Sequence, residues 1–136
     1  MKRISMVSVI DDDDLFQFII KKLIQATENI DAILPFRNGQ EAFDYFLENK
    51  VHADLLPDLV FLDLDMPVMN GWQFLEQFIK TTFAKRQIAI YICTVSINPR
   101  DREIYKHFSS LSGYLIKPIT KEEIKDILEK ELEEKL

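Results

Sequence analysis

Short apolar runs alternate along the chain with stretches of helical period, and this alternation limits the possible folds more than any other feature. We expect strands near residues 4–10, 31–36, 58–63, 88–94 and 113–116, all rich in Ile, Val, Leu, Phe or Tyr. The run 88–93 is continuously apolar, whereas a sheet with one solvated face would alternate apolar and polar residues. The pattern therefore predicts a parallel sheet that helices cover on both faces.

The first and third predicted helices are marked by apolar residues at helical spacing. The first follows the cap candidates Asp13 and Asp14. Its apolar face is expected to contain Phe16, Ile19, Ile20, Leu23 and Ile24. The third helix is expected to place four residues on one face: Trp72, Leu75, Phe78 and Ile79.

The fourth and fifth helices have clear start signals. Asn98-Pro99 is a capping residue followed by proline at the first helical position, which predicts the start of the fourth helix. Thr120 and Glu123 have the spacing of a capping box and predict the start of the fifth. The residues that the fifth helix is expected to bury are Ile124, Ile127, Leu128 and Leu132.

Five β-α units with right-handed crossovers give a doubly wound α/β sandwich. The 136 residues suit one domain, 1–136, and 47% hydrophobic content is enough to bury a core. In such a sheet, a functional site lies at the carboxyl ends of the strands.

Charge and cysteine content exclude several classes of function. A net charge of −6 argues against nucleic-acid binding, which depends on basic residues that contact phosphates. Cys93 is the only cysteine, so no intramolecular disulfide is possible and a reducing, cytoplasmic location is favoured. Asp11 interrupts the first apolar run too early for a signal peptide, and no run approaches the roughly 20 apolar residues of a membrane span. We therefore expect proteins or small ions as partners.

Polar residues stand at the predicted carboxyl ends of four strands. They are Asp11 and Asp12 after the first, Asp63 after the third, Thr94 after the fourth and Lys117 after the fifth. Three carboxylates brought together repel one another unless their pKa values rise or a cation neutralises them. Oxygen ligands at a solvent-facing sheet edge suit Mg²⁺. The sequence thus predicts a magnesium site.

With the metal bound, the same pocket can accept an anion. The Lys117 amine and the Thr94 hydroxyl would complete a cradle for a phosphoryl group, as a point charge and a hydrogen-bond donor. Asp63 is then free to act as a nucleophile and form an acyl phosphate.

These residues together resemble the receiver domain of response regulators, the phosphorylatable switch of two-component signalling. The resemblance covers essentially the whole chain. It rests on residues 9–13, on Asp63-Leu64-Asp65-Met66-Pro67 with Asn70-Gly71, on Thr94 and on residues 113–118. It implies a flavodoxin-like (βα)5 fold with strand order 2-1-3-4-5.

The resemblance also implies roles for single residues. Asp63 would be the phosphoacceptor, and Asp11 and Asp12 the acidic pair, with Asp12 the more direct Mg²⁺ ligand. Asp63 and the backbone carbonyl of Asp65 would complete the metal ligands.

By the same resemblance, Thr94 and Lys117 would contact the phosphoryl group. Tyr114 occupies the aromatic switch position, whose side chain turns inward when Thr94 is drawn toward the phosphate. The bond between Lys117 and Pro118 is often cis in this family, and only a following proline makes a cis bond accessible.

The expected partner is a sensor histidine kinase or a histidine phosphotransfer protein that donates a phosphoryl group from phosphohistidine. The chain would then be a phosphoacceptor rather than an enzyme. Residues 97–136 would form the surface that contacts a downstream protein target. Because the sequence stops after the fifth helix, no output domain is expected, and the chain would be a stand-alone receiver or one isolated from a longer chain.

Two positions depart from the usual pattern of the family and should tune its rates. Position 95, which is usually very small, is Val95, and its branched side chain should slow phosphorylation by small donors and autodephosphorylation. Asp65, where receivers often carry Asn, adds negative charge that should favour Mg²⁺ and disfavour the phosphoryl anion.

Three other families or functions share features with this sequence. Asp63-Leu64-Asp65-Met66 resembles the Asp-x-Asp motif of Mg²⁺-dependent phosphatases of the haloacid dehalogenase type, but that family places the motif on its first strand. A receiver-like module that works without phosphorylation also remains open, because of Val95. A flavodoxin would need a phosphate loop rich in Ser, Thr and Gly after the first strand, which this sequence lacks.

Overall fold

The sheet is parallel throughout, as the continuous apolar runs predict. The computed structural model describes residues 3–85 and 87–133. Its strands are β1 (Ile4–Ile10), β2 (Ile30–Phe36), β3 (Leu59–Leu62), β4 (Ala89–Thr94) and β5 (Leu111–Ile116), in the order β2-β1-β3-β4-β5. The α-helices are α1 (Asp14–Gln25), α2 (Gly39–Glu48), α3 (Gly71–Ile79), α4 (Pro99–Lys106) and α5 (Lys121–Glu133), and a 3₁₀ turn, η1 (Ala53–Leu55), precedes β3. The predicted fold class and strand order are confirmed.

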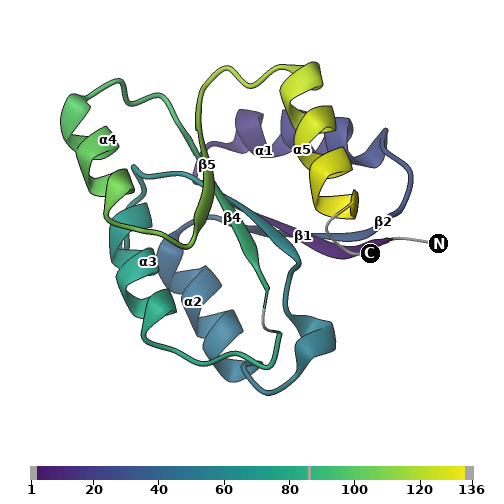
Figure 1. Ribbon diagram of the computed structural model, residues 1–136, viewed down its shortest axis with the longest axis horizontal. Helices are drawn as coiled ribbons and strands as arrows, with labels where there is room; N and C mark the ends of the chain where they lie inside the picture. Colours follow the sequence, from purple (N-terminus) through teal and green to yellow (C-terminus); the bar gives the residue numbers. More distant parts are fainter. Residues whose placement is uncertain (1–2, 86, 134–136) are drawn as a thin grey trace.

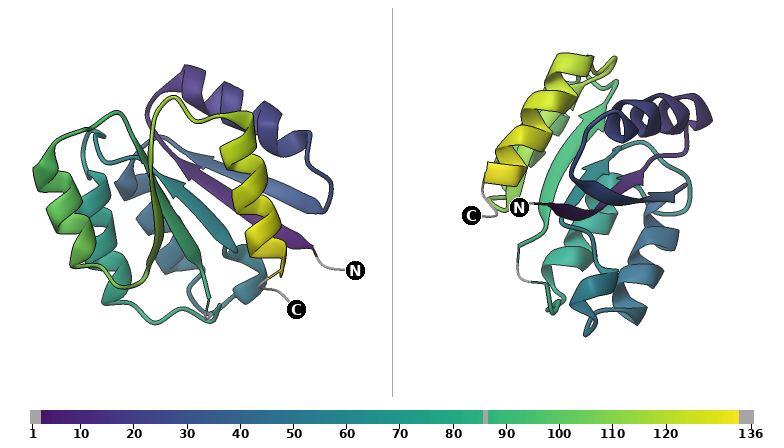
Figure 2. Two further views of the ribbon diagram at one scale, coloured as in Figure 1. Left: turned by 45° about the horizontal axis from the view of Figure 1, so that its top comes forward. Right: turned by 90° about the vertical axis from the view of Figure 1, so that its right-hand side faces the viewer.

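Helices cover both faces of the sheet (Figures 1 and 2). Helices α1 and α5 pack on one face, where their buried side chains meet those of β1, β3 and β4. Helices α2 and α3 pack on the other face around Phe46 and Phe74, both fully buried. No residue of α4 is buried, so this helix is attached mainly through half-buried aromatic contacts.

The predicted helix starts are confirmed by their caps. The Asp13 side chain accepts hydrogen bonds from the first-turn amides of α1, and Asn98 does the same for α4. At the start of α5, the Thr120 amide donates to the Glu123 carboxylate, and the Glu123 amide donates to the Thr120 hydroxyl.

Two residues predicted to lie on buried helix faces are exposed. Ile19 of α1 is 45% exposed and Ile79 of α3 is 55% exposed. Each directly neighbours an inward-facing residue in sequence, and one residue turns a helix by about 100°. In α3, Phe74 is fully buried in place of Ile79, although the helical spacing did not predict Phe74 on the buried face.

The strand register sets the positions of the polar residues that follow the strands. Ile10 pairs with Leu62 across β1 and β3, so Asp11 and Asp63 leave neighbouring strands side by side. The Asp63 amide donates to the Ile10 carbonyl over 2.9 Å. On the other side, the Lys117 amide donates to the Thr94 carbonyl over 2.8 Å. All four predicted strand exits therefore meet at one edge of the sheet.

Candidate functional site

Three carboxylates converge where β1 and β3 end. Ligand oxygens of Asp11, Asp12 and Asp63 lie within 4.8 Å of one another. Asp11 and Asp63 are buried, with 1% and 6% of their surfaces exposed, whereas Asp12 faces solvent. Such a group has the oxygen donors and the open side that a hydrated divalent cation requires, so its chemistry fits Mg²⁺.

Lys117 brings a positive charge into this group. Its Nζ lies 2.6 Å from Oδ2 of Asp11 and 3.9 Å from Oδ2 of Asp63. The ammonium also lies 4.2 Å from the ring centroid of Phe16, a cation–π contact that holds it over α1. Lys117 is thus paired with Asp11 in this structure and still close enough to Asp63 to contact a group bound there.

Burial and like charge raise the pKa values of the two inner carboxylates. The pKa of Asp63 is raised to about 7, first by burial and then by the charge of Asp11, while Lys117 and the Leu64 amide oppose the rise. Burial also raises the pKa of Asp11, with Lys117 opposing it. A cation between them would remove this repulsion and return Asp63 to its ionised form.

The turn after β3 fixes the Asp63 side chain. Its Oδ1 accepts the Leu64 amide over 2.8 Å, which leaves Oδ2 directed toward Lys117. Gly71 closes the turn, because its amide donates a hydrogen bond to the Leu64 carbonyl over 3.0 Å. A Cβ at this position would lie 2.4 Å from the Asp63 carbonyl oxygen. Only glycine fits this approach without moving the backbone of Asp63.

The same turn contains an unusual backbone conformation at Val68. Its φ is 69°, in the left-handed region that β-branched residues rarely adopt, and 78% of its surface is exposed. The Met69 amide donates to the Pro67 carbonyl over 2.8 Å across it. The turn therefore holds strain a few residues from Asp63.

Gln17 supports the site and was not predicted from the sequence. Its side-chain amide nitrogen lies 3.0 Å from each of three carbonyl oxygens, those of Val9, Asp11 and Phe36. These carbonyls belong to the ends of β1 and β2 and to the first residue of the acidic pair. A polar residue next to the inward face of α1 is the only sequence signal for this role.

Thr94 and Tyr114 belong to β4 and β5, which lie beyond β3 from β1 in the strand order. Thr94 is fully buried, and its Oγ1 accepts the Ser96 amide over 3.1 Å. The Tyr114 ring packs edge-on against Tyr105 at 5.3 Å between centroids. Its hydroxyl is buried and makes no hydrogen bond of normal geometry among the described residues. Burial raises the pKa of Tyr114, and the nearby Ser96 side chain opposes this rise.

The remaining predicted site residues are at the surface. Asp65 is exposed and lies outside the cluster of three carboxylates, although its charge contributes to the raised pKa of Asp63. Val95 is 66% exposed. The Lys117–Pro118 bond is cis, as the resemblance implied.

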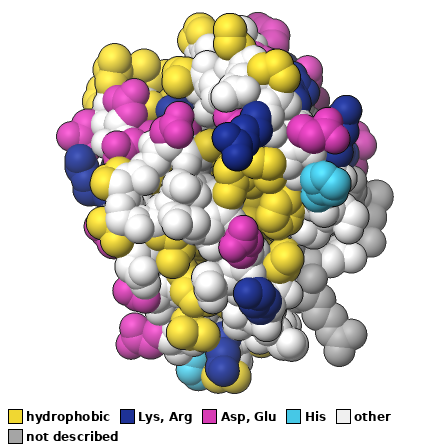
Figure 3. All heavy atoms as spheres, turned by 90° about the vertical axis from the view of Figure 1, so that its left-hand side faces the viewer, with side chains coloured by type: hydrophobic (Ala, Val, Ile, Leu, Met, Phe, Trp, Pro, Cys, Tyr) yellow, Lys and Arg dark blue, Asp and Glu magenta, His cyan; other side chains and the backbone are white. Residues whose placement is uncertain are grey.

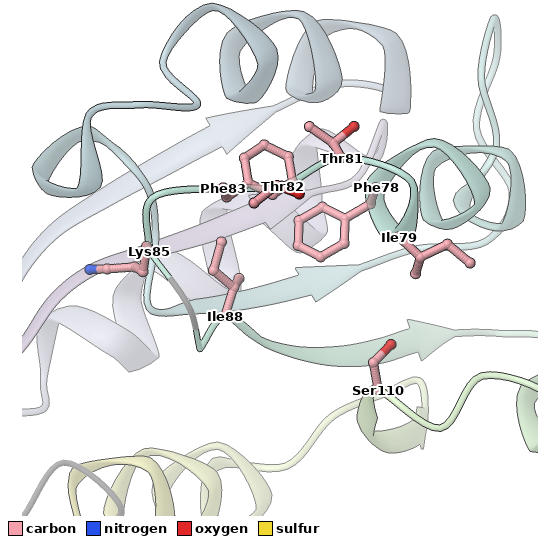
Figure 4. Close-up of a pocket in the computed structure, with 8 residues that line it drawn as sticks. All are labelled: Phe78, Ile79, Thr81, Thr82, Phe83, Lys85, Ile88 and Ser110. Atoms are coloured by element: carbon pink, nitrogen blue, oxygen red, sulfur yellow. The ribbon is translucent and has the colours of Figure 1, made fainter.

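A cavity of about 450 Å³ lies near the amino-terminal ends of β4 and β5, opposite the strand ends that carry the carboxylates (Figure 4). It is lined by the stacked rings of Phe78 and Phe83 and by residues that precede β4 and β5, such as Ile88 and Ser110. Lys85 at its rim is paired with buried Asp58 over 2.6 Å. This cavity is separate from the carboxylates, which follow the carboxyl ends of the strands.

The arrangement matches a known family. The family model of the response regulator receiver domain matches residues 7–129. The chain belongs to this family. Receiver domains are signalling modules of two-component systems and bind Mg²⁺ in an acidic pocket. Among the described residues, no helix is long and apolar enough to cross a membrane.

Individual relatives agree with this assignment. The chain is 28% identical over 125 residues to the probable methanogenesis regulatory protein FilR2 of Methanothrix harundinacea, and covers 79% of it. It is 40% identical over 65 residues to the transcriptional regulatory protein LnrK of Bacillus subtilis, which is 48% of this chain and 27% of LnrK. A two-component response regulator from Cytophaga hutchinsonii has a similar structure, with a TM-score of 0.82, 27% identity, and coverage of 97% and 99% of the two chains.

Proposed function

We propose that Asp63 accepts a phosphoryl group from a phosphohistidine of a sensor histidine kinase or a histidine phosphotransfer protein. The observation that carries this proposal is the surroundings of Asp63: two further carboxylates within 4.8 Å of it and a lysine ammonium 3.9 Å away. The carboxylates suit a divalent cation, and the ammonium suits the incoming anion. The chain acts as a phosphoacceptor in this proposal, not as an enzyme that turns over a separate substrate.

The residues of the chain position and neutralise the reacting groups. Oδ2 of Asp63 attacks phosphorus, a P–O bond forms and the P–N bond of phosphohistidine breaks. The imidazole nitrogen keeps the electron pair and takes a proton from water. Lys117 exchanges its contact with Asp11 for a phosphoryl oxygen, and the Thr94 hydroxyl donates to another.

Magnesium would be held by Asp11, Asp12, Asp63 and the backbone carbonyl of Asp65. When bound, it supplies positive charge to the carboxylates and to the phosphoryl oxygens. Asp63 attacks only in its ionised form, and its pKa of about 7 leaves that form incomplete at neutral pH without a cation. Cation binding and nucleophilicity are therefore coupled at this residue.

Two surface residues tune the rates in this proposal. Val95, exposed directly after Thr94, narrows the path to Asp63 for a small donor and for an attacking water. Val95→Ala should speed phosphorylation by acetyl phosphate and autodephosphorylation; if neither rate rises, this role is wrong.

Asp65→Asn should weaken Mg²⁺ binding and strengthen binding of the phosphoryl anion. Unchanged Mg²⁺ affinity would count against the role proposed for Asp65.

The signal then leaves through a protein–protein contact. The charge gained at Asp63 shifts an equilibrium between inactive and active arrangements through Thr94 and Tyr114. We expect residues 97–136, of which 134–136 lie outside the described residues, to present the changed surface to a downstream target.

The central experiment is incubation with Mg²⁺ and acetyl phosphate, followed by intact-mass measurement. Wild type should gain the mass of one phosphoryl group, and Asp63→Asn should not. Asp54→Asn is the matched control, because Asp54 is exposed in η1 before β3, away from the site. A negative result is repeated with a phosphohistidine donor. Failure of wild type with both donors would refute the proposal and favour a module that works without phosphorylation.

A further inference from the structure

A chain of hydrogen bonds leads from Thr94 to the only tryptophan of the protein. The Ser96 amide donates to Oγ1 of Thr94 over 3.1 Å, and the Ser96 hydroxyl donates to Oδ2 of Asp101. The other oxygen of Asp101 accepts the indole Nε1–H of Trp72 over 3.0 Å. Both carboxylate oxygens of Asp101 are thus engaged, one by the segment after β4 and one by α3.

Ser96 is held by hydrogen bonds to residues before and after it in the sequence. Its Oγ also accepts the Asn98 amide over 3.3 Å, and Asn98 caps α4 by accepting the Arg100 amide. Asp101 lies in the first turn of α4, two residues after the helix begins. A displacement of Thr94 therefore acts on Ser96 and, through it, on the start of α4.

Aromatic contacts connect Trp72, at the other end of this series of hydrogen bonds, to the surface around α4. The Trp72 ring stacks on Phe108, just beyond the end of α4, with 5.6 Å between centroids and 13° between planes. On the same helix, Tyr105 packs against Tyr114, and Arg102 lies 4.4 Å from the centroid of that ring. Figure 3 faces the side that carries α4, where hydrophobic side chains gather between acidic and basic ones.

We propose that Asp101 is a positioning residue that couples the Thr94 segment to α3 through Trp72. This inference rests on the proposed function of Asp63. When a phosphoryl oxygen draws the Thr94 hydroxyl, the bond from Ser96 to Thr94 changes, and the two bonds to Asp101 change with it. The surface that responds to phosphorylation then extends beyond the proposed readout range to Trp72 of α3, which packs on Phe108.

The first test needs no phosphorylation. Trp72 is the single tryptophan, so ¹⁵N-labelled protein gives one indole N–H resonance that reports its bond to Asp101. Asp101→Ala and Ser96→Ala should each shift this resonance by several line widths. Thr94→Val should also shift it, although Thr94 is the residue in this series of hydrogen bonds that is farthest from Trp72. Ser96→Thr keeps the hydroxyl and should restore the wild-type position.

Glu103→Ala is the matched control, because it removes one exposed acid from the same helix, whose carboxylate lies 3.6 Å from the Lys106 ammonium. It should leave the indole resonance in place. If Thr94→Val leaves the resonance unmoved, the coupling does not reach the phosphoryl site and the proposal is overturned.

The second test adds Mg²⁺ and acetyl phosphate and follows intact mass and the indole resonance in parallel. In wild type, both should change with the same rate constant. In Asp101→Ala, the mass should still increase while the indole resonance no longer responds. A wild-type protein that gains the phosphoryl mass with an unmoved indole resonance refutes the coupling and leaves the proposed function intact. Absence of mass gain with acetyl phosphate and then with a phosphohistidine donor refutes the proposed function, and the unphosphorylated variants still decide the coupling.

Discussion

Replacing Asp63 by Asn should stabilise the metal-free protein at neutral pH. Asp63 is buried beside Asp11, and its pKa is raised from 3.8 to about 7. Between these two pH values the folded chain keeps a proton that the unfolded chain has released. Stability therefore falls as pH rises through this window, and the loss is complete above the folded pKa. Asn has no charge to bury and escapes the loss.

The magnitude follows from the gap between the two pKa values. At about 1.4 kcal/mol per pKa unit, ionising Asp63 in the fold costs about 4 kcal/mol. Solvent at the open side of the site screens part of this cost, so we expect about 2 kcal/mol. Asn keeps an oxygen that can accept the Leu64 amide, so the hydrogen bond now made by Oδ1 is preserved.

The assay is urea unfolding followed by circular dichroism, in EDTA, at pH 4.5 and pH 7.5. Asp63→Asn should exceed wild type by about 2 kcal/mol at the higher pH and by much less at the lower one. Asp54→Asn should show no such pH-dependent difference. Added Mg²⁺ should stabilise wild type at pH 7.5 and narrow the difference. A difference between variant and wild type that is equal at both pH values would refute the reasoning.

Three substitutions test the supports of the fold, each by urea unfolding. Gly71→Ala should cost at least about 2 kcal/mol and slow acetyl phosphate labelling, because its Cβ would lie 2.4 Å from the Asp63 carbonyl oxygen; an unchanged stability contradicts this. Val68→Asn should stabilise by about 0.5–1 kcal/mol, because Asn tolerates positive φ; destabilisation would show that the conformation is not strained. Tyr91→Phe should cost about 1–3 kcal/mol by removing the 2.7 Å hydrogen bond to buried Glu131, and a neutral effect would mean that this bond adds nothing.

The central strands β3 and β4 were predictable because the sheet buries both of their faces, and burial leaves a continuous apolar run. The start of β5 was not, since the structure places it at Leu111 and the sequence at residue 113. Ser112 interrupts the apolar pattern and separates Leu111 from the rest of the strand, which hides this start. Gly113 is there for a tertiary reason, since a Cβ at this position would lie 2.7 Å from the ring of Tyr91 on β4.

The residues of the candidate site likewise include some that the sequence predicts and some that it does not. Asp11, Asp63 and Thr94 could be found because the exits of parallel strands share one edge, so order along the chain predicts proximity. Gln17 could not, because its contacts with three carbonyls depend on how α1 crosses the ends of β1 and β2. The hydrogen bond between Trp72 and Asp101 joins residues that are 29 positions apart on two different helices, and no sequence periodicity indicates it.

The instability predicted at Asp63 and its affinity for a cation have one physical origin. Burying Asp63 beside Asp11 disfavours the ionised carboxylate, and a divalent cation favours that same form. A site with a pKa of about 7 is partly protonated at neutral pH, so binding of Mg²⁺ must release part of a proton. Affinity for Mg²⁺ should then rise with pH up to about 7 and level off above it. The Lys117 ammonium, 2.6 Å from Asp11, moderates the repulsion and lets the metal-free site remain folded until the cation binds.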